Sequence, residues 1–150
     1  MIKFVKTNAE NPDFLALVKR LDATLKITDG VDHIFYSQFN KVDNIKHILV
    51  AYDNKVPVGC GAIKAYSDTC MEVKRMFVDE TKRGEGLGLE ILTRLEKWAA
   101  QLGCDSCILE TGKRQVDAIA LYKKAGYAVI ENYGQYSGVE NSVCFEKKIK

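Results

Sequence analysis

The chain has 150 residues, and its 22 lysines and arginines against 20 aspartates and glutamates leave a formal net charge of +2. This length predicts one domain over residues 1–150, and so small a charge argues against a nucleic-acid or membrane partner. No apolar run reaches the roughly 18 residues that a membrane-spanning helix needs. The N-terminus lacks the apolar core and cleavage pattern of a signal peptide, so we expect a cytoplasmic protein.

The cysteines are expected to be thiols, because a reducing cytosol does not sustain disulfides. They are Cys60, Cys70, Cys104, Cys107 and Cys144. The Cys104-x-x-Cys107 pair lacks a second pair of ligands, and both histidines, His33 and His47, lie far from it in the sequence. Since free cysteine often behaves as a small buried hydrophobe, we predict core-packing thiols and no metal.

The first third of the chain predicts a strand and then a helix. Apolar and polar residues roughly alternate over residues 2–6, as in a strand. Asn11, Pro12 and Asp13 are a helix-start signal. Apolar residues then recur at helical spacing, at Phe14, Leu17, Val18 and Leu21. Residues 28–30 break this helix. Residues 31–44 are polar and aromatic, and their pattern leaves open a short helix or a loop.

Three strands are predicted next, at residues 47–52, 56–66 and 71–78, with turns between them. Gly59 and Gly61 lie inside the second of these strands and indicate a bulge or close packing. Strands that follow one another across short turns favour an antiparallel meander.

The rest of the chain alternates helices and strands. Apolar residues at helical spacing predict a helix that Gly103 ends: Leu87, Ile91, Leu92, Leu95, Trp98, Ala99 and Leu102. We then expect a strand at 106–110, a helix at 116–125 closed by Gly126, a strand at 127–130, a turn-rich loop at 133–138 and a strand at 142–148. This order predicts an α/β fold with a mixed sheet, antiparallel at first and parallel where the helix crosses over.

A glycine-rich run, Arg-Gly-Glu-Gly-Leu-Gly at residues 83–88, joins the predicted strand 71–78 to the following helix. Glycines let backbone N–H groups approach a ligand. The first turn of a helix adds N–H groups without internal partners and the positive end of the dipole. The run therefore predicts an anion site for a phosphate or pyrophosphate, although a tight turn would also explain three glycines. It matches neither the P-loop nor the dinucleotide fingerprint.

Arg83-Gly84-Glu85-Gly86-Leu87-Gly88 instead resembles the R/Q-x-x-G-x-G/A signature of the GNAT superfamily of N-acetyltransferases. The resemblance runs from about residue 46 to the C-terminus, is firmest over residues 71–127, and is closest to small bacterial members. It implies the GNAT (acyl-CoA N-acyltransferase) fold, with a mixed antiparallel and parallel central sheet flanked by helices.

The resemblance also implies how acetyl-CoA, the acyl donor, is held. The loop N–H groups and the charge of Arg83 would bind its pyrophosphate. The central strand would be splayed from the next one at a bulge, and its end would pair with the pantetheine amides while one N–H polarises the acetyl carbonyl. Those strand residues could equally be core residues, since the contacts are backbone ones. The implied cofactor-binding residues are Met76, Phe77, Val78, Arg83, Gly84, Glu85, Gly86, Leu87, Gly88 and, where the family often has asparagine, Gln115.

Two side chains are implied as catalytic. Tyr122 corresponds to the tyrosine that commonly lies beside the coenzyme A sulfur as general acid, although a tyrosine packed in the core is the alternative. Glu72 matches the strand position of a glutamate base, acting directly or through water. Alternation places Glu72, Lys74 and Met76 on one face of the strand, so an ion pair of Glu72 with Lys74 is the alternative. Tyr133 and Tyr136 line the acceptor pocket or form a surface turn.

The function implied is an acetyl-CoA-dependent N-acetyltransferase that transfers an acetyl group to a primary amine of a small-molecule or amino-acid-like acceptor, by direct attack in a ternary complex. The alternatives are a coenzyme A-binding module without turnover, and an acetyltransferase acting on protein or peptide amines. The expected partner is the amine acceptor, with no nucleic acid and no membrane; a homodimer is left open.

Overall fold

The computed structural model describes residues 1–38 and 45–150. These residues form two units, Met1–Lys64 with Val73–Leu95, and Ala65–Glu72 with Glu96–Lys150. The strands β3 (Val56–Ser67) and β4 and the helix α3 each contribute residues to both units. The expectation of one domain therefore stays a prediction, and the two units are described separately below.

The first unit is built on an antiparallel sheet. Its strands are β1 (Ile2–Thr7), β2 (His47–Asp53), β3 (Val56–Ser67) and the later part of β4 (Cys70–Val78), neighbours in that order. β1 pairs antiparallel with β2, and β2 with β3. The register of β2 on β3 shifts between Ala51 and Tyr52, which is a β-bulge. The antiparallel pairing predicted for β2 and β3 is confirmed.

The first helix of the first unit begins and ends where the sequence predicts. α1 (Pro12–Asp29) starts at Pro12, and the side chain of Asn11 caps it by accepting the Phe14 N–H at 3.0 Å. Segment 31–44, left open above, is helical over its first part, as η1 (Gly30–Asp32) and α2 (His33–Ser37). The remainder of that prediction, residues 39–44, lies outside the described residues. The unit also contains η2 (Glu80–Lys82) and the start of α3 (Leu87–Gln101).

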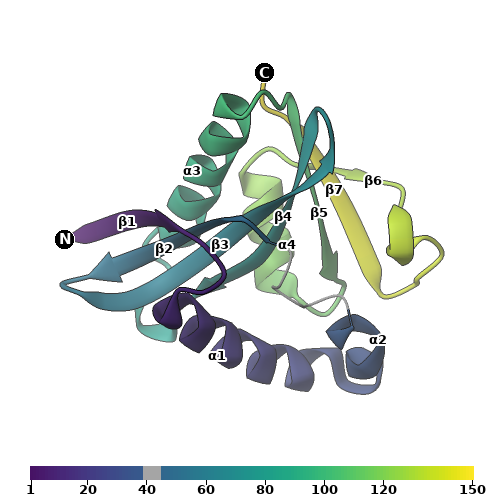
Figure 1. The fold of residues 1–150 in the computed structure, drawn as a ribbon. Coiled ribbons are helices and arrows are strands. Elements are labelled where there is room, and N and C mark those ends of the chain that lie inside the picture. The colour runs from purple at the N-terminus through teal and green to yellow at the C-terminus, as the bar shows by residue number, and fades with distance from the viewer. Residues whose placement is uncertain (39–44) are drawn as a thin grey trace. The chain divides into compact units, whose positions relative to one another are not determined.

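Two helices cover opposite faces of β3 (Figure 1). Cys60 and Ala62 lie in a buried cluster with Phe14, Leu17 and Val18 of α1. Gly59 and Gly61 alternate with them along the strand and therefore point to the other face. A Cβ atom on Gly61 would lie 2.8 Å from Leu95 Cδ1 and 3.0 Å from Ile91 Cγ2, both on α3. Close packing is thus the reason for these glycines in the strand.

The second unit is organised by β5 (Ser106–Gly112). Its first residues pair in parallel with Cys70–Glu72 of β4, as the helical crossover predicts. All seven residues of β5 pair antiparallel with β7 (Ser142–Lys148), and β6 (Ala128–Ile130) pairs with the other edge of β7. The last strand of the chain is therefore inserted between the two that precede it, and the seven strands follow the order β1-β2-β3-β4-β5-β7-β6.

The helix α4 (Val116–Lys124) lies against β7 through one aromatic contact, between the rings of Tyr122 and Phe145, whose centroids are 6.0 Å apart. Phe145 is fully buried. The end of α3 is tied to the same strand, because Lys147 Nζ lies 2.9 Å from Glu96 Oε1. One apolar position was wrongly placed: Leu102 lies beyond the end of α3 and is 44% exposed.

Gly61→Ala tests the close packing of β3 on α3. The new methyl group would lie 2.6 Å from Met76 Sδ as well as against the two α3 side chains, so we expect the free energy of unfolding to fall by about 1–3 kcal/mol. Without the contact, replacing glycine by alanine would raise stability by about 0.4–1 kcal/mol. Urea denaturation measures the difference. Combining the change with Met76→Ala should cost less than the sum of the two single changes; strict additivity would contradict the packing.

Candidate functional site

The glycine-rich loop joins β4 to α3 as predicted, with the short η2 between them that the sequence did not indicate. Gly84 and Gly86 have φ angles of +81° and +84°. This left-handed backbone conformation, which other residues rarely adopt, is the reason for glycine at both positions. Crowding is not the reason, because no atom lies within 4 Å of the position of an added Cβ at either residue. The loop therefore presents open backbone without a side chain over it.

The loop leaves a run of N–H groups without backbone partners. Within the described chain, Arg83 N–H donates to the Glu80 carbonyl at 3.4 Å, and the next N–H found on a backbone carbonyl is that of Glu90, at 3.0 Å from Gly86 O. The N–H groups of residues 84–89 lie between these two. This run includes the N–H groups of the loop residues Gly84, Gly86, Leu87 and Gly88, whereas the N–H of Arg83 already has a backbone acceptor.

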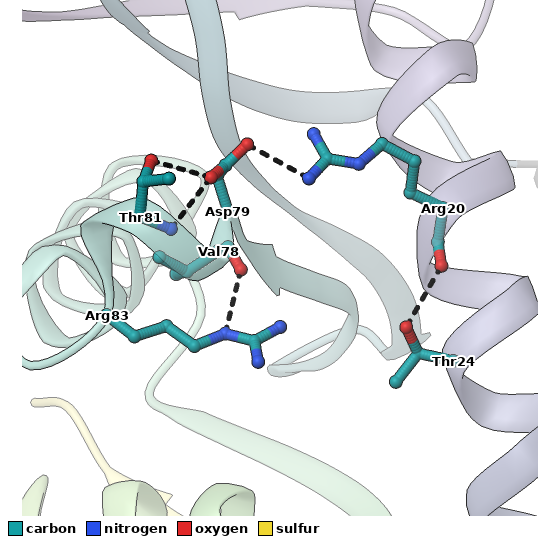
Figure 2. A network of polar contacts seen from close by, with 6 residues as sticks. All are labelled: Arg20, Thr24, Val78, Asp79, Thr81 and Arg83. Carbon is teal, nitrogen blue, oxygen red and sulfur yellow. Dashed lines mark hydrogen bonds and ion pairs between the residues drawn. The ribbon is translucent and has the colours of Figure 1, made fainter.

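Positive charge gathers at the end of β4, where the loop begins (Figure 2). Arg83 Nε donates to the Val78 carbonyl at 3.0 Å, and its guanidinium lies 5.9 Å from the ring centroid of Phe77. A second guanidinium, that of Arg20 on α1, lies 5.2 Å from the same ring and 2.9 Å from Asp79 Oδ2. Met76, Phe77 and Val78, the predicted strand-end residues, thus lie beside the loop in the first unit.

Asp79 anchors this network. Its Oδ1 accepts the Thr81 N–H at 2.9 Å and the Thr81 hydroxyl at 2.7 Å, and so caps η2. These hydrogen bonds, followed by the ion pair with Arg20, lower the pKa of the Asp79 carboxyl to about 2. Asp79 is therefore ionised across the physiological range, and it neutralises one of the two guanidinium groups.

The backbone of β4 is distorted at Arg75, whose φ is +58°. This conformation is rare for a residue other than glycine inside a strand. Its carbonyl accepts from Cys60 Sγ at 3.4 Å, and its buried guanidinium pairs with Asp22 of α1. The resemblance implied a bulge in this strand without placing it at a residue. An arginine inside a strand pattern is not a turn signal, so the amino-acid sequence could not have shown that the distortion lies at Arg75.

The second unit contains the predicted base, Glu72, in contact with a tyrosine. The Tyr133 hydroxyl donates to Glu72 Oε2 at 2.6 Å. Burial, and then the negative charge of Glu72, raise the pKa of the Tyr133 hydroxyl, which therefore stays protonated and keeps donating. The sequence suggested Tyr133 only as a lining residue of the acceptor pocket.

Tyr122, the predicted acid, is buried in the second unit. Its ring lies edge-on to Tyr127, with centroids 6.0 Å apart, in addition to its contact with Phe145. Burial, and then the charge of Glu110, raise the pKa of its hydroxyl. Gln115 precedes α4 without capping it through its side chain, and its N–H donates to the Gly112 carbonyl at 3.0 Å.

Glu110 was missed by the sequence analysis. It follows the buried part of β5, and its Oε2 accepts from the Ser142 hydroxyl at 2.7 Å. Its charge also contributes to raising the pKa of the Tyr136 hydroxyl, after burial. A strand of β-branched and apolar residues offers no signal for such a role, because the partner residue lies 32 positions away in sequence.

The cysteines are free thiols and all are buried, as predicted. Burial raises the pKa of the Cys60 and Cys107 thiols to about 12, so both are inert as nucleophiles near neutral pH. In the described residues, no group of three or more His, Cys, Asp or Glu side chains is arranged to hold a metal ion. None of the described helices is long and apolar enough to cross a membrane.

Comparison with known proteins defines the class. The model of the acetyltransferase (GNAT) family matches residues 13–127, which is most of the chain. The chain therefore belongs to the GNAT acetyltransferase family. The expected GNAT fold is confirmed as well: a Klebsiella pneumoniae protein assigned as an acyl-CoA N-acyltransferase superposes with a TM-score of 0.84 at 30% identity, covering 100% of this chain and 99% of that one.

Other relatives are more distant or are matched over part of their length. An IAA acetyltransferase of Azospirillum brasilense is 41% identical over 102 residues, which are 67% of each chain. The N-acetyltransferase YjcF of Bacillus subtilis is 33% identical over 93 residues, 62% of this chain and 64% of that protein. A PaiA N-acetyltransferase of Thermoplasma acidophilum, solved with coenzyme A, shares the fold at 20% identity, a TM-score of 0.73 and 99% coverage of both chains.

Asp79→Asn tests the network at the loop. Because the pKa of Asp79 is about 2 in the folded chain against 3.8 as its ordinary value, its charge stabilises the fold fully above about pH 4, and this contribution is lost as the pH falls to about 2. Asparagine can still cap η2, so the variant isolates the charge. We expect a lower melting temperature at pH 7 and no difference near pH 2. A difference that does not change with pH would contradict this assignment; Asp68→Asn, on an exposed turn, is the control.

Proposed function

We propose that the chain is an acetyl-CoA-dependent N-acetyltransferase that acetylates a primary amine of a small-molecule or amino-acid-like acceptor, by direct attack in a ternary complex. The observation that carries the proposal is the run of N–H groups at residues 84–89, at the start of α3, which have no backbone partner in the part of the chain that the structure describes. Family membership supports acetyl transfer, and the name of the Azospirillum relative supports a small acceptor.

The loop fits a pyrophosphate on two grounds. Its donors are backbone N–H groups at a helix N-terminus, which is a preferred environment for phosphate oxygens. Its glycines leave the approach open, because an added Cβ at Gly84 or Gly86 would meet no atom within 4 Å. Arg83 would add charge. The strand end 76–78 would supply backbone partners for the pantetheine amides. The Val78 carbonyl accepts from Arg83 Nε in this structure, so that hydrogen bond would break first.

The proposed reaction forms one C–N bond and breaks one C–S bond. The acceptor ammonium gives a proton to Glu72, directly or through water, and the neutral amine attacks the thioester carbonyl. Coenzyme A leaves as the thiolate and becomes the thiol by taking the second proton, which the attacking nitrogen loses after attack; the other product is the amide, and Glu72 keeps the first proton. A backbone N–H of the strand end would stabilise the oxyanion. In other enzymes, removing one such donor raises the activation free energy by about 3 kcal/mol.

Tyr122 is proposed to stabilise the leaving sulfur by donating a hydrogen bond. An ordinary tyrosine has a pKa near 10 and a thiol near 8.5, so full proton transfer is already uphill by roughly 2 kcal/mol. Burial raises the pKa of Tyr122 further, which widens this gap. Among the described residues no acceptor is found for its hydroxyl, so the hydroxyl is available to a ligand. Hydrogen-bond donation is therefore favoured over complete protonation.

Isothermal titration with acetyl-CoA, followed by thiol release with a panel of amines, tests the proposal. We expect binding, and turnover with at least one small primary amine. Gly86→Ala should weaken acetyl-CoA binding by about tenfold or more, because alanine is strained at a φ of +84° and the N–H groups would reorient.

The matched control for that variant is Gly103→Ala. Gly103 has a φ of +95° at the end of α3, so the change introduces a similar strain away from the loop. Its affinity for acetyl-CoA should equal that of the wild type. Wild-type protein that does not bind acetyl-CoA would refute the proposal. Binding without turnover of any amine would favour a coenzyme A-binding module, and turnover only with peptides would move the acceptor to protein amines.

Tyr122→Phe tests the leaving-group role. We expect kcat to fall by about ten- to a hundredfold while the dissociation constant for acetyl-CoA changes little, because the hydrogen bond strengthens as charge develops on sulfur. Tyr127→Phe is the matched control, because Tyr127 is a neighbouring buried tyrosine whose ring contacts that of Tyr122. An unchanged kcat in Tyr122→Phe would remove Tyr122 from the mechanism.

A further inference from the structure

The hydrogen bond from Tyr133 to Glu72 joins residues 61 positions apart in sequence. Its donor is held by a loop that is itself tied down at the base. Asn132, the preceding residue, donates through Nδ2 to the Val139 carbonyl at 2.9 Å and to the Ser142 carbonyl at 3.1 Å. These two bonds close the segment between β6 and β7 on itself, so Tyr133 leaves a restrained backbone.

The ring of Tyr133 is restrained as well. Its centroid lies 5.2 Å from that of Tyr66 and 5.8 Å from that of Tyr136, and both contacts are edge-to-face. Tyr136 is buried, in η3 (Gly134–Tyr136), and Tyr66 lies near the end of β3. A ring fixed by two neighbours aims its hydroxyl in one direction, and that direction is the Glu72 carboxylate. Arrangements of this kind fix the geometry of a reactive group in advance.

We propose that Tyr133 is a positioning residue for Glu72: its hydroxyl holds the carboxylate in one orientation and keeps it ionised for the acceptor ammonium. The inference rests on the proposed role of Glu72 as the base. A donor to the charged form of a carboxylate favours that form.

Other titratable groups face the same carboxylate. The charge of Glu72 contributes to the raised pKa of the Tyr136 hydroxyl, and to that of the Cys144 thiol on β7, which is about 11. Both groups are therefore neutral near pH 7. Glu110 lies on β5, two residues beyond Ile108, which pairs with Glu72. Lys74 lies two residues along β4 from Glu72. Tyr133 donates a hydrogen bond directly to Glu72, so removing its hydroxyl gives the test.

The experiment is a titration of the Glu72 side chain by carbon-13 NMR of glutamate-labelled protein, with the resonance assigned by its loss in Glu72→Gln. In Tyr133→Phe, which keeps the ring and loses the hydroxyl, we expect the titration midpoint of this carboxyl to move up by about one pH unit. The acid limb of the kcat/KM profile should move by the same amount. Above that limb, kcat should stay below that of the wild type, because the carboxylate has lost the hydroxyl that orients it.

Tyr66→Phe is the matched control, because it removes a hydroxyl from the same group of rings without touching the bond to Glu72. Its midpoint and its pH profile should match those of the wild type. A Tyr133→Phe midpoint equal to that of the wild type would overturn the inference, and so would an equal shift in Tyr66→Phe, which would indicate a general loosening of the loop.

The reciprocal measurement keeps the inference falsifiable if Tyr133→Phe does not fold. In Glu72→Gln the carboxylate charge is absent, so the ring carbon of Tyr133 that bears the hydroxyl should titrate at lower pH than in the wild type; no change would overturn the inference. The outcomes also separate the two proposals. Absence of turnover in the wild type refutes the enzyme reaction while the NMR titration still tests the bond. Turnover with an unmoved acid limb in Tyr133→Phe refutes the role of Tyr133 alone.

Discussion

The N–H groups of residues 84–89 are the constraint on which the rest of the first unit depends. A buried or enclosed backbone N–H normally finds a carbonyl, and this segment has six in succession for which no backbone carbonyl is found among residues 1–38 and 45–150. The glycines with left-handed φ angles make that possible, because they turn the chain from β4 into α3 without side chains that would cover the donors. A helix of fifteen residues follows and adds its dipole.

Such a loop needs a rigid support, and the structure supplies it on both sides of β3. Because Gly61 has no side chain, Met76 and the α3 side chains pack closely against this face of the strand. On the other face, Cys60 and Ala62 lie in the buried cluster with α1. The distortion at Arg75 lies next to this packing and is held by the Asp22 ion pair and by Cys60. Strain of about 1–3 kcal/mol at one residue persists only where its surroundings determine it.

The second unit supports its polar groups in a different way, with tyrosines. The ring of Tyr133 contacts those of Tyr66 and Tyr136 edge-to-face, and Asn132 closes the loop that carries Tyr133 and Tyr136. Tyr122 forms a separate contact with Tyr127 and Phe145. Rings restrained in this way have little rotamer freedom to lose, so their hydroxyl groups can be aimed without a large entropic cost when a ligand binds.

Local pattern was sufficient for the elements. The spacing of Phe14, Leu17 and Val18 predicted α1, and the strand at 142–148 was predicted with the bounds that the structure has. The glycine loop could also be predicted, since its chemistry resides in consecutive residues whose backbone acts. Helical period, strand alternation and glycine turns are properties of a short segment, and so they can be read without knowing what the segment packs against.

What the sequence determined by itself is therefore the α/β class, the loop and the family resemblance. Only the tertiary structure decided that β7 lies between β5 and β6, that the strand distortion falls at Arg75, and that the Tyr133 hydroxyl meets Glu72. The strand order and the Tyr133–Glu72 hydrogen bond join residues far apart along the chain, and the distortion at Arg75 is held by such residues. No local period specifies such a pairing, because it depends on which surfaces the folded chain brings together.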